Sequence, residues 1–332
     1  MKILVTGCFG FIGYNFINSI LENNNKDFLL LGIDSLNNPY SRLNYKNLGE
    51  SEYFKFYKED ICNISNLDLS NKDQIDLVIN FAAESHVDTS IYNPGLFIKS
   101  NVLGVNNLLS FCVENNIKDF IQISTDEVYG STKDEFYSET QKLNPSSPYS
   151  ASKASSDMLC NSYKTTFGLN IKTIRPANNY GIYQQPEKLI PFSIGNLSEK
   201  NEIEIYGDGK NIRHWLSVKD TVEAIKCIIE KGKDNEIYNI GSGEYFTNND
   251  IALKLIEYFN LDLNAIKYVQ DRPGHDFRYA VNFDKLSNLG WKPKNYFETV
   301  LPETIDWYLE NKYWWKQNID ELRKRRDLRF NI

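Results

Sequence analysis

The sequence predicts an α/β protein with a doubly wound parallel sheet, followed by a smaller mixed α/β domain. Three observations carry this prediction. Short β-rich runs alternate with longer helix-like segments, a glycine turn follows the first run, and the regular alternation stops after Arg175 and Pro176. Strands that alternate with covering helices are typical of parallel sheets.

The individual elements follow from this alternation. The predicted strands are residues 3–5, 28–33, 77–82, 120–124 and 171–174. The segments near 11–23, 102–115 and 150–167 are long enough for the helices that parallel crossovers need. Scattered Pro, Gly and Asn then mark the second domain. We therefore predict a Rossmann-type domain at 1–178, with a returning segment at about 213–243, and a second domain mainly at 179–332.

The composition is that of a globular, acidic protein. The chain has 332 residues, and 37 basic against 44 acidic side chains give a net charge of −7. This balance disfavours a broad nucleic-acid surface, and no apolar run approaches the roughly 18 residues of a membrane span. No export signal is visible, so we expect a cytoplasmic protein with no nucleic-acid or membrane partner. His86, His214 and His275 lack metal-ligand spacing, so we expect no metal.

A glycine-rich turn, TGCFGFIG at 6–13, joins the first strand to the first helix. Its Gly7, Gly10 and Gly13 would allow a tight turn, close approach to a pyrophosphate and close helix packing. Asp34 ends the second strand about 20 residues later, where an acid would bind a ribose 2′-OH and repel a 2′-phosphate. NAD is therefore predicted over NADP, and the alternative is a glycine turn without a ligand.

The stretch STDEVYG at 124–130 places a hydroxyl beside two carboxyls at the carboxyl edge of the sheet, where such folds bind ligands. Asp126 and Glu127 can hold different protonation states, one donating a proton while the other removes one. Thr125 precedes them. On these three residues alone, an ordinary acidic turn is the stronger alternative.

A Tyr-x-x-x-Lys pair is predicted to supply the base toward an alcohol. Tyr149 and Lys153 lie at the start of the helix after this stretch, where positions i and i+4 share one face. A neighbouring ammonium lowers a tyrosine pKa. The alternative is a surface Tyr/Lys pair, since the pattern also occurs at Tyr129/Lys133, Tyr206/Lys210 and Tyr308/Lys312.

With these residues the sequence resembles the extended short-chain dehydrogenase/reductases, and within them the nucleotide-sugar 4,6-dehydratases. The glycine loop and the Tyr149/Lys153 pair mark only the superfamily. The stretches that resemble the subfamily are STDEVYG, AAESHVD at 82–88, RPANNYG at 175–181, QPEKLIP at 185–191 and DRPGHD at 271–276. The resemblance runs nearly end to end, and it implies a homodimer built from helices that flank the sheet.

The resemblance also implies the site residues. Those expected at NAD are Gly7, Gly10, Phe11, Ile12, Gly13, Asp34, Ser35, Leu36, Asn37, Asp60, Ile61, Phe81, Ala82, Ala83, Ser85, Ser100, Tyr149, Lys153 and Asn179. Those expected at the nucleotide-sugar substrate are Ser85, Thr125, Asn178, Lys188, Leu189, Glu204, Ile205, Tyr206, Arg213, Asn248, Asp271, Arg272, Pro273, Gly274 and His275.

The implied reaction is an internal redox cycle around an elimination. Tyr149 would deprotonate the sugar C4 hydroxyl, oriented by Thr125, while hydride passes to NAD. Glu127 would remove the C5 proton, Asp126 would protonate the departing C6 hydroxyl, and the hydride would return to C6. Two rivals are a 4-epimerase or decarboxylase on the same scaffold and a catalytically silent NAD-binding protein.

The sequence departs from the family pattern in several places, which include Cys8 and Phe9 in the glycine loop. His214 stands where an Asp is usual, Phe277 replaces a common basic residue, and Glu204 replaces a usual Pro. The choice between thymidine and uridine nucleotides is left open.

Overall fold

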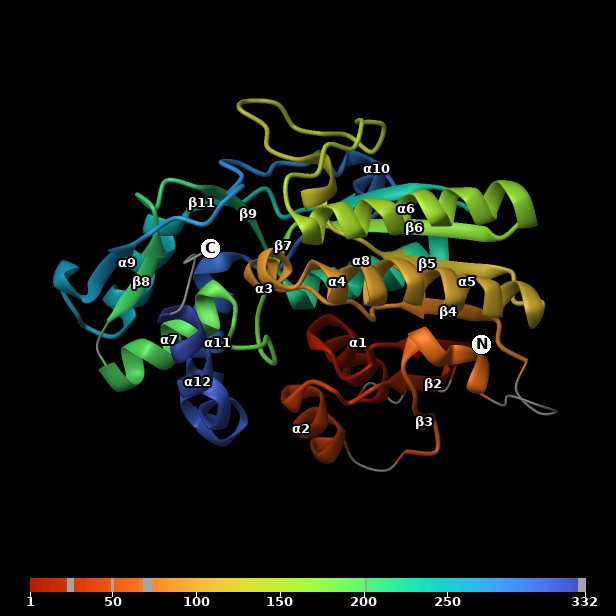
Figure 1. Cartoon of the computed structure of the whole chain (residues 1–332), viewed down its shortest axis with the longest axis horizontal. Helices are drawn as coiled ribbons and strands as arrows, with labels where there is room; N and C mark the ends of the chain where they lie inside the picture. Colours follow the sequence, from red (N-terminus) through yellow and green to blue (C-terminus); the bar gives the residue numbers. More distant parts are fainter. Residues whose placement is uncertain (23–26, 49–50, 68–73, 201, 328–332) are drawn as a thin grey trace.

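A seven-stranded parallel sheet forms the larger part of the protein (Figure 1). The computed structural model describes residues 1–22, 27–48, 51–67, 74–200 and 202–327. The sheet has the order β10-β6-β5-β4-β1-β2-β3, and every pairing in it is parallel. Its strands are β1 (Lys2–Thr6), β2 (Leu29–Asp34), β3 (Phe54–Lys58), β4 (Leu77–Asn80), β5 (Asp119–Ile123), β6 (Asn170–Pro176) and β10 (Ile237–Ile240).

Helices bury both faces of this sheet. Ile3 and Val5 belong to the apolar cluster shared with α1 (Phe11–Leu21) and α8 (Val218–Lys231), whereas Leu4 belongs to the cluster shared with α5 (Val105–Glu114). The long α6 (Pro148–Phe167) packs beside α5. Alternate residues of a strand face opposite layers. A strand that helices cover on both sides is therefore a continuous apolar run in the sequence.

The helix before β5 is longer than the sequence predicted. It begins with α4 (Pro94–Phe97), passes through a π-helical stretch, η2 (Ile98–Gly104), and continues as α5. The run Pro94–Glu114 is apolar and long enough to cross a membrane by length and composition, but 44% of its most apolar window is buried inside the protein. A core helix passes the same test, so this helix is weak evidence for a membrane span.

The smaller part carries two small sheets. One contains β7 (Asn178–Tyr180), β9 (Ile212–Ser217) and β11 (Tyr245–Thr247), and the other pairs β8 (Ile203–Tyr206) with β12 (Ile266–Val269). Their helices pack around buried Phe297, Tyr308, Trp314 and Trp315. These helices are α7 (Leu189–Lys200), α9 (Asn248–Tyr258), α11 (Phe297–Glu310) and α12 (Lys312–Asp327).

Short elements join the two parts. Trp314 donates from Nε1 to Asn44 Oδ1 at 2.8 Å, which ties α12 to α2 (Pro39–Asn47) beside the large sheet. The remaining short helices are η1 (Ile61–Asn66), α3 (Val87–Tyr92), η3 (Asp126–Tyr129), η4 (Leu263–Ala265) and α10 (Asp284–Ser287).

The predicted fold class is confirmed, and the structure adds two strands, β3 and β10, to the five predicted for the large sheet. The sequence analysis omitted β3, where Lys55 and Lys58 interrupt the apolar pattern of an edge strand. From the proposed returning segment, α8 and β10 join the large layer, while β9 belongs to a small sheet. The boundaries at 178 and 179 stay a prediction.

Candidate active site

The glycine loop between β1 and α1 forms a tight cradle, in which side chains at Gly7 and Gly13 would collide with neighbouring backbone. Gly7 has φ +64°, and a Cβ there would lie 2.6 Å from the backbone nitrogen of Ala82. A Cβ on Gly13 would lie 2.4 Å from the carbonyl oxygen of Gly7. Gly10 is the N-cap of α1 and adds no side-chain hydrogen bond, so the N–H groups of the first turn, which holds Phe11 and Ile12, can face an anion.

Asp34 lies at the carboxyl end of β2, next to this loop. Its carboxylate accepts hydrogen bonds from the backbone N–H of Phe9 at 3.1 Å and of Leu36 at 2.9 Å. Burial raises the pKa of Asp34, and the two N–H groups oppose that rise. Ser35, Leu36 and Asn37 follow, with Leu36 at φ +55°. The sequence-predicted acid therefore stands at the rim of the glycine cradle, where a ribose would be bound.

The other residues predicted to hold NAD follow the next strands of the sheet. Asp60 comes after β3 and accepts from Cys62 N at 2.9 Å, which starts η1 with Ile61 as its first residue. Residues 81–85, which include Phe81, Ala82, Ala83 and Ser85, directly follow β4. Because parallel strands end at one edge, these residues share that edge with the glycine loop.

Asn101 ties the loop after β4 to the catalytic helix, and the sequence analysis missed it. It accepts from Glu84 N at 2.8 Å and donates to Glu84 O and to Ser152 Oγ, each at 2.9 Å. Its side chain is fully buried in the π-helical stretch, next to the predicted Ser100. Such π-helical insertions frequently occur at functional sites. Because Asn106 and Asn107 follow in the same helix, no sequence signal marked Asn101.

The two neighbouring acids after β5 have different surroundings. Asp126 is 2% exposed, its Oδ1 accepts from Thr125 at 3.3 Å, and its Oδ2 has no partner in the described part of the chain. Burial, with help from the charge of Glu127, raises the pKa of Asp126 to about 8. Burial also raises the pKa of Glu127, but the cations Arg272, Lys188 and Arg213 oppose this rise. Three cations thus oppose the rise at Glu127, which makes Asp126 the better proton donor of the two acids.

Tyr149 and Lys153 lie on the first turns of α6. Ser147 and Ser150 form a capping box there, with Pro148 at the first helical position. Lys153 Nζ donates to Ile123 O at 2.6 Å, and burial lowers its pKa to about 8. Burial and Glu127 raise the pKa of Tyr149 well above its usual range, against a hydrogen bond with Thr125. The predicted lowering of the Tyr149 pKa by Lys153 is therefore not found, because the Lys153 ammonium donates to a backbone carbonyl while burial and the charge of Glu127 raise this pKa.

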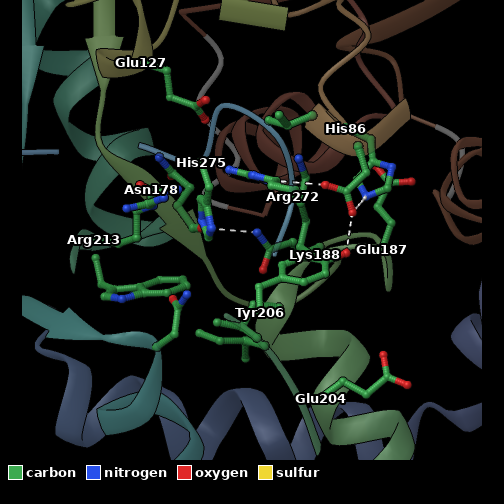
Figure 2. A pocket seen from close by; sticks show the side chains of 18 residues that line it. His86, Glu127, Asn178, Glu187, Lys188, Glu204, Tyr206, Arg213, Arg272 and His275 are labelled. Carbon is green, nitrogen blue, oxygen red and sulfur yellow. Dashed lines mark hydrogen bonds and ion pairs between the residues drawn. The ribbon is translucent and has the colours of Figure 1, made fainter. Parts of the chain in front are cut away.

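A cavity lies between this edge of the sheet and the smaller part. Figure 2 shows Glu127 at its upper end, Glu204 and Tyr206 at its lower end, and His275 and Arg272 between them. Eleven predicted residues line it, namely Glu127, Asn178, Asn179, Lys188, Leu189, Glu204, Tyr206, Arg213, Asn248, Arg272 and His275. Segments far apart in the chain thus meet around one cavity, which holds three side chains with permanent positive charge.

Some predicted substrate residues do not line this cavity. Ile205 is fully buried in the core, whereas the carbonyl of Ser85 accepts from Lys188 Nζ at 2.5 Å. Asp271 pairs with His275 Nδ1 at 2.6 Å and orients that ring. The others outside the lining are Thr125, Pro273 and Gly274. The roles predicted for these residues stay predictions.

The sequence analysis also missed residues that line the cavity. Trp215 Nε1 is buried without a hydrogen-bond partner in the described structure, as is Oδ1 of the predicted Asn178. Asp88 lies in the AAESHVD motif and Glu187 lies in the QPEKLIP motif, so their place in these motifs was the available signal. The complete set of missed lining residues is His86, Val87, Asp88, Gln184, Glu187, Ile190 and Trp215.

His214, one of the departures from the family pattern, is part of the framework. Its Nε2 accepts from the N–H groups of Ser242 and Gly243, each at 2.8 Å, and its ring stacks on Tyr245. Burial lowers its pKa to about 3, so the ring is neutral. Among the described residues, no cluster of His, Cys, Asp or Glu could hold a metal ion.

Known proteins share this sequence and fold. The sequence profile of the GDP-mannose 4,6 dehydratase family matches residues 4–304. The dTDP-glucose 4,6-dehydratase of Streptomyces antibioticus is 39% identical over 321 residues, covering 95% of each chain. The solved structure of DesIV, a dTDP-glucose 4,6-dehydratase from Streptomyces venezuelae with NAD bound, has a TM-score of 0.91 at 37% identity, covering 96% of this chain and 99% of DesIV.

A UDP-glucuronic acid 4-epimerase from Bacillus cereus is a more distant neighbour. Its TM-score is 0.86 at 27% identity, covering 93% of this chain and 99% of the epimerase. The fold and the site together define an extended short-chain dehydrogenase/reductase. Within that class, the chain belongs to the nucleotide-sugar 4,6-dehydratase family, as its sequence motifs had predicted.

Proposed function

We propose that this protein is a hydro-lyase that converts dTDP-glucose to its 4-keto-6-deoxy form with NAD as cofactor, and that UDP-glucose is the alternative substrate. The observation that carries this proposal is the pair of unlike acids, Asp126 and Glu127, beside Tyr149. An elimination needs one group that donates a proton and one that removes a proton. A 4-epimerase needs no such pair, so the pair disfavours that rival.

The glycine cradle and Asp34 fit NAD. The close packing at Gly7 and Gly13 holds the loop at the N-terminus of α1, whose first N–H groups can bind a pyrophosphate, and the fixed carboxylate of Asp34 suits a ribose with a free 2′-OH. The chemistry that the bound cofactor supplies is acceptance of hydride from the sugar C4 and its return to C6. The protein has to supply the proton transfers.

Each proton transfer has a candidate residue. Tyr149 takes the proton of the C4 hydroxyl, and Thr125, which shares a hydrogen bond with Tyr149, orients the C4 oxygen. Glu127 then removes the C5 proton, which the C4 ketone makes acidic. Asp126, whose pKa burial raises to about 8, carries the proton that the departing C6 hydroxyl needs at neutral pH. Lys188, Arg213 and Arg272 supply charge for the substrate diphosphate.

The test is incubation of the purified protein with dTDP-glucose and with UDP-glucose, followed by NMR of the products. We expect a 4-keto-6-deoxy product, with higher kcat/KM for the thymidine nucleotide, because the two relatives described above are dTDP-glucose 4,6-dehydratases. A failure to form this product from either substrate would overturn the proposed function. A higher kcat/KM for UDP-glucose would overturn the nucleotide preference alone.

The protein is further proposed to be a cytoplasmic homodimer that associates through the helices on one face of the large sheet. Large apolar side chains are exposed on adjacent helices there, including Ile98, Leu103, Met158 and Phe167. We expect the double variant Leu103→Asp/Met158→Asp to sediment as a monomer. The control Leu263→Asp places the same charge at an exposed leucine of the smaller part and should leave the dimer intact. A wild-type monomer would contradict this proposal.

A further inference from the structure

Asp88 is a buried acid that joins the two sides of the cavity. It lies on α3, the short helix that follows β4 of the large sheet in the chain, and it is 6% exposed. Its Oδ2 accepts from the Tyr206 hydroxyl at 2.6 Å, and its Oδ1 lies 3.4 Å from Nη1 of Arg272. Dashed lines in Figure 2 mark these contacts beside the labelled Tyr206 and Arg272.

The two partners of Asp88 lie at the end of one small sheet or just beyond it. Tyr206 is the last residue of β8, and Arg272 follows β12, which pairs with β8 in parallel register. A single carboxylate therefore fixes two loops of the smaller part against the larger part.

The position of this acid carries an electrostatic cost. If Arg272 binds a diphosphate, a carboxylate 3.4 Å away weakens that attraction and repels the ligand. The guanidinium nevertheless keeps free capacity, because Arg272 lines the cavity with 15% of its side chain exposed, and its Nε has no hydrogen-bond partner in the described part of the chain. One edge of Arg272 is thus held by Asp88, while another donor remains for a ligand in the cavity.

We propose that Asp88 is a positioning residue, which holds Arg272 and Tyr206 in place so that the free donors of Arg272 meet the substrate diphosphate. This inference rests on the proposed function. A guanidinium has five donors in a fixed planar fork, so fixing one edge also fixes the direction of the others. The ordering of a long side chain before binding lowers the entropy lost when the substrate binds. This gain offsets the repulsion by Asp88.

The test compares Asp88→Asn with wild type in steady-state kinetics and in ligand binding. The amide keeps the size of the side chain and an acceptor for Tyr206 but loses the charge that holds Arg272. We expect KM for the nucleotide sugar to rise about tenfold, as for loss of one charged contact, with kcat within about threefold. The Kd of the nucleoside diphosphate should rise equally, whereas that of the nucleoside monophosphate should change less than about twofold.

A double-variant cycle ties the effect to Arg272. Once Arg272→Met has removed the guanidinium, the further change Asp88→Asn should raise the Kd of the nucleoside diphosphate no more. Tyr206→Phe removes only the hydroxyl held by Asp88 and should raise this Kd by about threefold. It also provides a second variant if Asp88→Asn does not fold, which NAD content and melting temperature will show.

Asp234→Asn is the matched control. Asp234 pairs with Lys172 at 2.8 Å, is half exposed and does not line the cavity, so this change should leave KM and Kd as in wild type. An unchanged or lower KM in Asp88→Asn, or an equal loss of affinity for mono- and diphosphate, would overturn the role of Asp88. A wild-type protein that forms no 4-keto-6-deoxy product would instead overturn the proposed function.

Discussion

The edge of the large sheet proposed to bind the cofactor and the cavity beside it are built by different means. At the cofactor edge, backbone geometry decides, since a Cβ at Gly7 or Gly13 would collide with neighbouring backbone. In the cavity, charged side chains decide, and Glu127 faces Lys188, Arg213 and Arg272 from three other segments. A backbone site is fixed by the local fold, whereas a charged site depends on which segments meet. The two regions should therefore fail separately when mutated.

The largest separate effect is expected from Glu127→Gln. This change keeps the shape of the side chain but removes the base, so exchange of the C5 proton with solvent should slow by about 10²- to 10⁴-fold. NMR of the substrate in D₂O measures this rate, and the content of bound NAD should stay as in wild type. Asp126→Asn is the matched control, since it should retain C5 exchange and lose elimination of water. Unchanged exchange in Glu127→Gln would place the base elsewhere.

The variant Gly7→Ala is expected to damage the cofactor edge rather than the cavity. The new Cβ meets Ala82 N at 2.6 Å in a left-handed backbone, so the loop must move and the protein should lose bound NAD. Gly290→Ala is the control, because Gly290 has φ +97° and no atom near the added Cβ. It should cost only the backbone strain of about 1–2 kcal/mol in the free energy of unfolding, with NAD retained. Equal NAD loss in both variants would exclude the close approach as the cause.

The smallest effect concerns the pH dependence of stability at Asp126, which is buried beside Glu127. The pKa of Asp126 in the folded protein is raised to about 8 from its usual 3.8, so its contribution to stability is complete below pH 4 and is lost as pH rises toward 8. Asp126→Asn removes this titration. We expect the variant to gain about 1–3 kcal/mol in the free energy of unfolding relative to wild type between pH 5 and pH 8. Denaturant unfolding at both pH values measures the gain, and a difference independent of pH would contradict it.

The parts that the sequence predicted are local in the chain. The glycine loop, Asp34, and the acids after β5 each follow directly from a strand, and Tyr149 and Lys153 share one helix face. Such features need only the strand end or the helix period to place them. The edge strand β3 escaped prediction because its lysines break the apolar run, and Asn101 escaped because its partners lie 17 and 51 residues away.

The sequence by itself determined the parallel sheet, the cofactor loop and the family. Periodicity, strand ends and motifs each depend on residues that are close together in the chain. Only the tertiary structure decided which charges surround Glu127, that His214 is a neutral framework residue, and that Asp88 reaches Tyr206 and Arg272. Those facts depend on burial and on contacts between segments that are 28 to 184 residues apart in the chain. Burial sets the pKa values of the acids, and only the folded chain has a buried interior.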